Sequence, residues 1–114
     1  LRRVYGELST EPLVYRSGGL ELNSETRLVS IEGQRIDLTP TEFAILQTLM
    51  ARPGRVFTRM ELLDSAQGDA YAGYERTIGV HIKNLRLKIE PDAHPPRYLE
   101  TVFGVGYRLN PDVE

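Results

Sequence analysis

The chain has 114 residues, of which 40% are hydrophobic and 26% are charged, and it contains no Cys. This length suits one domain with a single core, and the lack of Cys excludes a disulfide framework, a Cys-based zinc site and a thiol nucleophile. No apolar run approaches the roughly 18 residues of a membrane span. Because Leu1-Arg2-Arg3 leads into no apolar segment, we expect no signal peptide, a cytoplasmic location without membrane contact, and a piece of a longer protein.

Positive charge is concentrated in one segment of the chain. The formal net charge is −2, from 14 Lys and Arg against 16 Asp and Glu. Residues 76–89 hold four basic side chains and no acidic one, and the other residues hold 10 basic against 16 acidic side chains. The overall balance argues mildly against nucleic acid as a partner, but a short positive stripe on an acidic body is sufficient to attract phosphates.

The N-terminal third predicts a linker followed by a small antiparallel sheet. Residues 1–12 show no period and are interpreted as an interdomain linker. Strand-like segments follow at 13–16, 20–23, 27–31 and 34–38. The two residues between the last two segments, Glu and Gly, fit a hairpin loop, and connections this short join only antiparallel strands.

Two capping boxes mark the starts of two helices. In Thr39-Pro40-Thr41-Glu42 and in Thr58-Arg59-Met60-Glu61, a Thr stands three residues before a Glu, the spacing at which each side chain accepts a hydrogen bond from the other residue's backbone. The first helix is expected to end at Arg52-Pro53-Gly54. The second helix follows an extended link at Val56-Phe57 and is expected to end near Gly68.

The C-terminal half predicts a longer helix and a hairpin. The third helix is expected to run over about 75–90, which is followed by a Pro. A β-hairpin follows over 98–109, with a glycine-rich tip at Phe103-Gly104-Val105-Gly106. The predicted domain therefore covers 13–110, and 111–114 form a tail.

The third helix has two unlike faces. At about 100° per residue, one apolar stripe faces the core and consists of Ile78, Ile82, Leu85 and Ile89. The opposite face carries Arg76, Val80, Lys83, Asn84 and Leu87, with Thr77, His81 and Lys88 on one flank and Arg86 on the other. Cations suit phosphates or guanine, an amide suits adenine, and a small apolar group suits the thymine methyl. This face therefore suits the DNA major groove.

Two interpretations of this helix compete. Periodicity alone fits equally well an amphipathic helix whose cationic face is merely solvated. Three helices followed by a hairpin, however, make a winged helix-turn-helix, in which one helix enters the major groove and the hairpin, or wing, reaches the neighbouring backbone. We therefore predict an α+β winged helix-turn-helix that binds double-stranded DNA sequence-specifically.

Four blocks of sequence carry a resemblance to a known family. They are LTPTEF at 38–43, RVFTRMELL at 55–63, ERTIGVHIKNLR at 75–86 and TVFGVGYRL at 101–109. With these blocks in this order, the chain resembles the C-terminal effector domain of OmpR/PhoB-type response regulators over residues 12–109.

The resemblance implies both an architecture and a set of partners. The architecture is an N-terminal four-stranded antiparallel sheet, three helices and a C-terminal wing. An upstream receiver domain, absent from this chain, would be phosphorylated on Asp by a histidine kinase in a bacterial two-component phosphorelay that regulates transcription. The domain would bind direct-repeat half-sites of DNA as a homodimer and contact RNA polymerase through the loop at 66–74.

The resemblance also assigns DNA-binding roles to particular residues. On the third helix, Arg76 and Thr77 would contact the backbone, His81 and Lys88 would approach phosphates, and the groove-facing set would be Val80, Lys83, Asn84 and Arg86. Arg59 would contact a phosphate beside the start of the second helix. The wing would supply Thr101, Tyr107 and Arg108, the last with either a DNA-binding or a structural role.

Three positions depart from the family pattern. Family members often carry a basic residue in place of Asn84, an Arg in place of Phe103, and a polar side chain in place of Leu87. Phe103 would either pack on sugar edges or lie against the core, and Leu87 would mark either a protein contact or a weaker phosphate grip. Phe103, Leu87 and the acidic overall balance support an alternative function, a winged-helix protein-interaction module without sequence-specific DNA binding.

No enzymatic constellation is visible in the sequence. The two histidines, His81 and His94, have no carboxylate at metal-ligand spacing in a recognisable motif. No Ser lies in a triad context, and no acid/base pair is evident. We therefore expect no catalytic residue, no metal and no cofactor.

Overall fold

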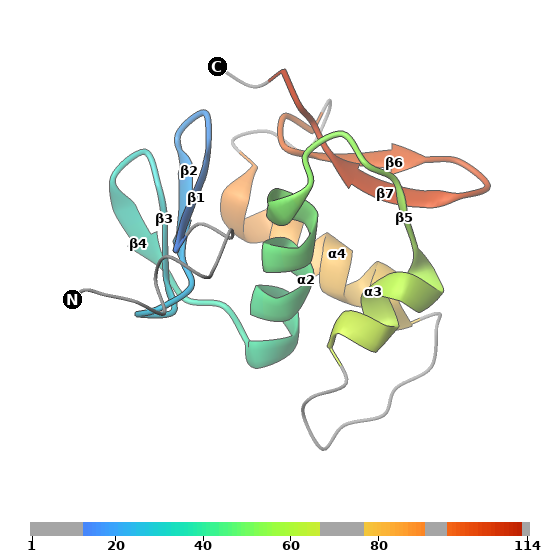
Figure 1. The fold of residues 1–114 in the computed structure, drawn as a ribbon, viewed down its shortest axis with the longest axis horizontal. Helices are drawn as coiled ribbons and strands as arrows, with labels where there is room; N and C mark the ends of the chain where they lie inside the picture. Colours follow the sequence, from blue (N-terminus) through green and yellow to red (C-terminus); the bar gives the residue numbers. More distant parts are fainter. Residues whose placement is uncertain (1–12, 67–76, 91–95, 113–114) are drawn as a thin grey trace, which may run out of the picture.

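The computed structural model describes residues 13–66, 77–90 and 96–112. Its N-terminal part is a four-stranded antiparallel sheet in the order β1-β2-β3-β4, as the sequence predicts (Figure 1). The strands are β1 (Val14–Ser17), β2 (Leu20–Asn23), β3 (Leu28–Ile31) and β4 (Gln34–Ile36). The hairpin loop between β3 and β4 has φ of 51° and 83° at its two residues, as a tight primed turn requires.

In the described ranges 13–66, 77–90 and 96–112, the helices are α2 (Pro40–Ala51), α3 (Arg59–Ser65) and α4 (Thr77–Ile89). Both predicted capping boxes are present, with reciprocal side-chain to backbone hydrogen bonds at the starts of α2 and α3. Helix α3 ends earlier than predicted, because Ala66 rather than Gly68 is its C-terminal cap. The first predicted residues of the third helix, 75 and 76, lie outside the described residues.

A second sheet forms at the C-terminal end. The predicted hairpin consists of β6 (Leu99–Val102) and β7 (Gly106–Leu109), and the short strand β5 (Phe57–Thr58) pairs with β7 to give the order β5-β7-β6. The sequence indicates only an extended link at this position. A Cβ on Gly106 would collide with the backbone carbonyl of Phe57, so the close approach of these two strands requires glycine there.

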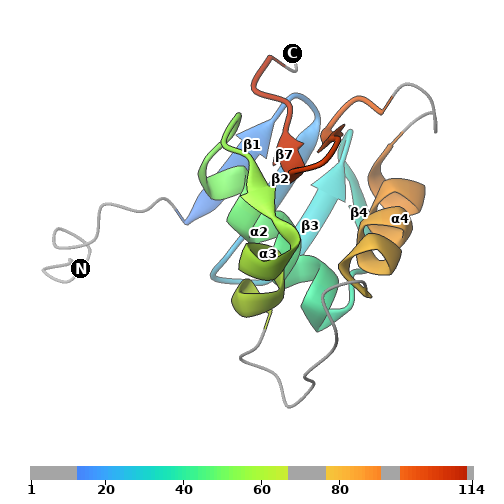
Figure 2. The ribbon, with the colours of Figure 1, turned by 90° about the vertical axis from the view of Figure 1, so that its right-hand side faces the viewer.

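The core lies around α2, which contacts β1, α3, α4 and β7. Figures 1 and 2 show α2 between the four-stranded sheet on one side and α3 with the hairpin on the other. All four residues of the predicted apolar stripe of α4 are buried: Ile78, Ile82, Leu85 and Ile89. Tyr98 is 1% exposed, and its hydroxyl accepts a hydrogen bond from the backbone N–H of Gly19 at 3.3 Å, which links the two sheets.

Within the described residues, no helix is both long enough and apolar enough to cross a membrane.

Candidate nucleic-acid interface

The outer face of α4 is solvent-exposed and free of acidic side chains. Val80 is 58% exposed and Leu87 is 73% exposed, Lys83 is exposed, and Asn84 is half-buried. Lys83 forms no ion pair with another described residue. The inner stripe fixes this orientation, since the residues about half a turn away from Ile82 and Leu85 must point outward. The exposed stripe therefore presents a cation, an amide and apolar groups to a partner.

Lys88, on one flank of α4, is paired inside the protein. Its Nζ lies 2.7 Å from Oε1 of Glu42, whose side chain is only 3% exposed, while the Lys88 side chain is 35% exposed. The sequence predicts that Lys88 approaches DNA phosphates, but the structure gives its ammonium an internal carboxylate. The two residues are 46 positions apart, so the short-range pattern of α4 contains no sign of this pair.

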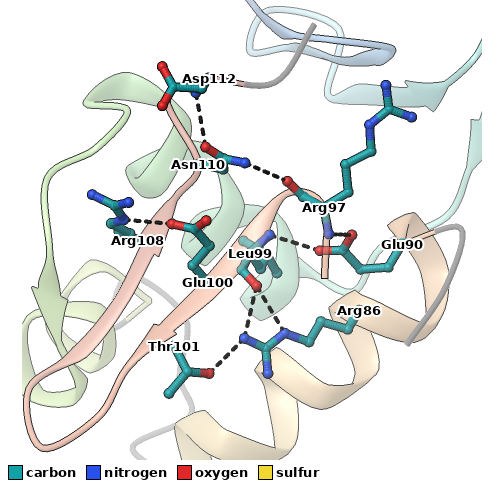
Figure 3. Close-up of polar contacts among 9 residues, drawn as sticks. All are labelled: Arg86, Glu90, Arg97, Leu99, Glu100, Thr101, Arg108, Asn110 and Asp112. Carbon is teal, nitrogen blue, oxygen red and sulfur yellow. Dashed lines mark hydrogen bonds and ion pairs between the residues drawn. The ribbon is translucent and has the colours of Figure 1, made fainter. Parts of the chain in front are cut away.

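Arg86, on the opposite flank, points toward the wing (Figure 3). Its Nη2 donates to the backbone oxygen of Leu99 at 2.9 Å and to Oγ1 of Thr101 at 2.8 Å, and its Nε donates to the same Leu99 oxygen at 3.3 Å. The guanidinium carbon also lies 5.9 Å from the ring centroid of Tyr107. The sequence places Arg86 in the groove-facing set, whereas the structure uses its guanidinium to join α4 to β6.

Glu90 is a structural residue of this region that the sequence analysis misses. Its carboxylate accepts hydrogen bonds from the backbone N–H groups of Arg97 at 2.6 Å and Leu99 at 2.8 Å (Figure 3), and from that of Tyr98 at 3.0 Å. These bonds join the end of α4 to the start of β6. The one available signal in the sequence is an acidic residue at a helix C-terminus, where the helix dipole disfavours negative charge.

Two further side chains of the wing, Arg108 and Tyr107, lie near its base. Nε of Arg108 donates to Oε1 of Glu100 at 2.7 Å across the β6–β7 pair, which supports the structural role among the two expected for Arg108. A Cβ on Gly79 would lie 3.8 Å from the Tyr107 hydroxyl. The Tyr107 hydroxyl therefore lies near Gly79, with room for a methyl group between them.

The wing tip, in contrast, has apolar side chains in solvent. Phe103 is 90% exposed and Val105 is 52% exposed. The expectation that Phe103 lies against the core is therefore wrong, because the tip extends beyond the body of the domain. Its packing on sugar edges stays a prediction.

Residues of the helices and of the wing together line two hollows on the surface. A groove of about 1320 Å³ lies between α4 and the wing, where Lys83 and Leu87 face Val102 and Phe103. A smaller hollow of about 570 Å³ is lined by Thr58, Arg59 and the wing residues from Thr101 to Tyr107. The structure therefore brings the exposed Arg59 beside the wing, as a shared interface requires.

The remaining predicted residues are only partly placed. Thr77 begins α4 and His81 follows one turn later, both half-buried. Arg76 lies outside the described residues, as does the predicted loop at 66–74 apart from Ala66.

Known proteins are similar to this chain in sequence and in fold. Residues 33–109 match the family described as "Transcriptional regulatory protein, C terminal". The chain is 45% identical over 96 residues to the sensory transduction protein RegX3 of Mycobacterium leprae, an alignment that covers 84% of this chain and 48% of RegX3. The chain therefore spans about half the length of that relative.

Solved structures agree with this similarity. The response regulator DrrB of Thermotoga maritima, an OmpR/PhoB homologue, matches with a TM-score of 0.77 and 36% identity over 86% of this chain and 44% of DrrB. The DNA-binding domain of Klebsiella pneumoniae RstA, in complex with the RstA box, matches with a TM-score of 0.75 and 30% identity over 86% of this chain and 97% of that domain. These similarities confirm the winged helix-turn-helix fold and the resemblance to OmpR/PhoB-type regulators. The chain belongs to the family of C-terminal domains of transcriptional regulatory proteins, which are regulators of transcription and not enzymes.

Proposed function

We propose that this chain is the sequence-specific, double-stranded DNA-binding output domain of a bacterial two-component response regulator. The observation that carries the proposal is the outer stripe of α4, where Val80, Lys83 and Leu87 are exposed and no carboxylate interrupts the positive charge. A helix of this kind fits the major groove. The similarity to the RstA domain bound to its DNA box supports the same conclusion.

We assign the recognition helix, at about 75–90, to the major groove and the wing, at 98–109, to the adjacent backbone or minor groove. Asn84 would read a base edge by its amide, and Val80 would contact a thymine methyl. The phosphate contacts would come from Lys83, from Arg59 at the start of α3, and from Thr77 and His81 on α4. Arg76, which lies outside the described residues, belongs to the same proposed set. In the wing, Thr101, Tyr107 and Arg108 belong to the proposed surface, although Thr101 and Arg108 also form contacts that hold the wing.

The wider assembly is part of the proposal. The chain covers 48% of RegX3, which leaves room in a full-length protein for an upstream receiver domain. Residues 1–12 would then be the interdomain linker, 13–110 the DNA-binding domain and 111–114 a tail. Homodimerisation on direct-repeat half-sites, a contact of loop 66–74 with RNA polymerase, and a cytoplasmic location complete the proposal.

Selection of duplexes from a random pool tests this function. The domain should enrich duplexes with a common sequence element, and log K should fall linearly with log [salt] as counterions are released. Absence of enrichment, or binding that does not depend on salt, would instead support the protein-interaction module.

Asn84→Ala tests the base-reading role directly. The variant should lose about 1–3 kcal/mol of discrimination at one base pair, because the amide that distinguishes the bases is removed. Its affinity for a scrambled duplex of equal length should stay unchanged, since phosphate contacts are retained. An equal loss on both duplexes would contradict the assignment.

A further inference from the structure

Lys88 has a partner that a phosphate would have to displace. Oε1 of Glu42 accepts hydrogen bonds from Lys88 Nζ at 2.7 Å and from the backbone N–H of Thr39 at 3.0 Å. The carboxylate therefore stands at the N-terminus of α2, where the helix dipole also favours a negative charge. A single oxygen thus connects the start of α2 with the C-terminal half of α4.

The two side chains are buried to different extents, so the loss of the ion pair destabilises Glu42 more than Lys88. Glu42 is 3% exposed and cannot exchange its partner for water, whereas Lys88 is 35% exposed. Removal of a cation from a buried carboxylate leaves an uncompensated charge, which is strongly destabilising. If the Lys88 ammonium moved to a DNA phosphate, the protein would incur this cost at Glu42.

The direction of Lys88 also separates it from the exposed stripe of α4. Lys88 lies on the flank that faces α2, and Arg86 lies on the flank that faces the wing. The buried stripe sets which face of α4 points outward, and the contacts on the two opposite flanks restrict the remaining rotation of α4 about its axis. That rotation determines whether Lys83, Asn84 and Val80 point toward a partner, because these residues lie between the flanks.

We propose that Lys88 is a positioning residue of the DNA-binding surface: its ion pair with Glu42 restricts the rotation that the buried stripe still leaves to α4, and its ammonium does not bind a DNA phosphate. This inference rests on the proposed function. It differs from the expectation from sequence, in which Lys88 approaches phosphates from the helix flank.

The chain offers a matched set of variants to test the proposal. In the double variant E42Q/K88M, Gln keeps the capping-box acceptor at the start of α2 and Met keeps the length of the Lys stem, so the cation disappears while the net charge is unchanged. K88M alone leaves Glu42 buried and unpaired. K83M removes an exposed cation from the outer stripe and is the control.

Thermal unfolding without DNA measures the ion pair. K88M should lower Tm by about 10 °C, because Glu42 loses its partner, and E42Q/K88M should unfold at a clearly higher temperature than K88M. A double variant that unfolds at or below the temperature of K88M would overturn the proposal. The DNA measurement uses the double variant, so it does not depend on the folding of K88M.

Binding to a duplex recovered from the random pool, and to a scrambled duplex, separates positioning from phosphate contact. K83M should reduce the steepness of log K against log [salt] by about 0.9, while E42Q/K88M should keep the wild-type slope. The double variant should reduce the ratio of the two affinities by about fivefold, since the reading residues are less well oriented.

A slope that falls as much in E42Q/K88M as in K83M would show that Lys88 binds a phosphate. An unchanged affinity ratio would show that the pair has no positioning role. If the wild-type domain itself enriches no duplex, the proposed function fails and this inference fails with it, whatever the variants do.

Discussion

Helices α2 and α3 begin with the same motif in different surroundings. At each start the Thr hydroxyl accepts from the Glu backbone N–H at 3.1 Å, and the Glu carboxylate accepts from the Thr backbone N–H at 3.0 Å in α2 and 2.9 Å in α3. Each Glu also pairs with a cation, Glu42 with Lys88 and Glu61 with Arg55. The Glu42 side chain is 3% exposed, but that of Glu61 is 42% exposed.

The difference separates local from tertiary stabilisation. The hydrogen bonds of a capping box are made within four residues, so they form equally well at both sites. The ion pair contributes substantially to the free energy of unfolding only where water cannot replace the partner of the charged group. The same four-residue motif therefore only starts the helix at α3, whereas at α2 its Glu also forms part of the contact between α2 and α4.

The largest contrast is expected from removal of the two cations. Lys88→Ala should lower the free energy of unfolding by about 2 kcal/mol, because a buried carboxylate is left unpaired at a site with limited access to water. Arg55→Ala should cost about 0.5 kcal/mol, since both members of its pair are exposed. Urea denaturation of both variants measures the difference, and similar losses would contradict the argument from burial.

The two Thr residues should give equal, intermediate effects. Thr39→Ala and Thr58→Ala each remove one acceptor for a backbone N–H at a helix start, and each should cost about 1 kcal/mol. Urea midpoints at constant m-value measure these losses. A much larger loss for Thr39 would mean that the α2 box is reinforced by its surroundings as a whole, and not through Glu42 alone.

The smallest effect should come from salt. Double-mutant cycles for Glu42–Lys88 and Glu61–Arg55 give two coupling free energies, measured at about 0.1 M and 1 M NaCl. The exposed pair should lose most of its coupling at high salt, where the Debye length is about 3 Å, and the buried pair should keep most of its coupling. Equal sensitivity to salt would show that ions reach Glu42.

The capping boxes and the apolar stripe of α4 could be predicted because each pattern involves only residues that are close together in the sequence. The starts of α2 and α3 and the burial of Ile78, Ile82 and Leu85 need no information from distant residues. For the same reason the outward direction of Val80 and Lys83 follows from the period alone.

The partners of the flanking cations could not be predicted from this pattern. Lys88 meets Glu42 across 46 positions, and Arg86 meets Thr101 across 15. A period places a residue on a flank but does not say which element covers that flank. A cation there therefore looks the same in sequence whether it faces a phosphate or an internal acceptor.

Strand β5 could not be predicted from the sequence for another reason. Two residues, Phe57 and Thr58, are too few to show alternation, and their partner strand is almost 50 positions away. From the sequence, Gly106 is assigned only to a glycine-rich hairpin tip, although its lack of a side chain is what allows β5 to approach β7.

The pairing of β5 with β7 has a mechanical consequence. Because Thr58 is both the last residue of β5 and the cap of α3, the hairpin and α3 cannot pivot independently of each other. Arg59 and the tip residue Phe103 line the same hollow, and the pairing of β5 with β7 restricts changes in the distance between them. A molecule that contacts Arg59 and Phe103 at once must have contact points at this spacing. A partner whose contact points are further apart or closer together can bind only one of the two residues.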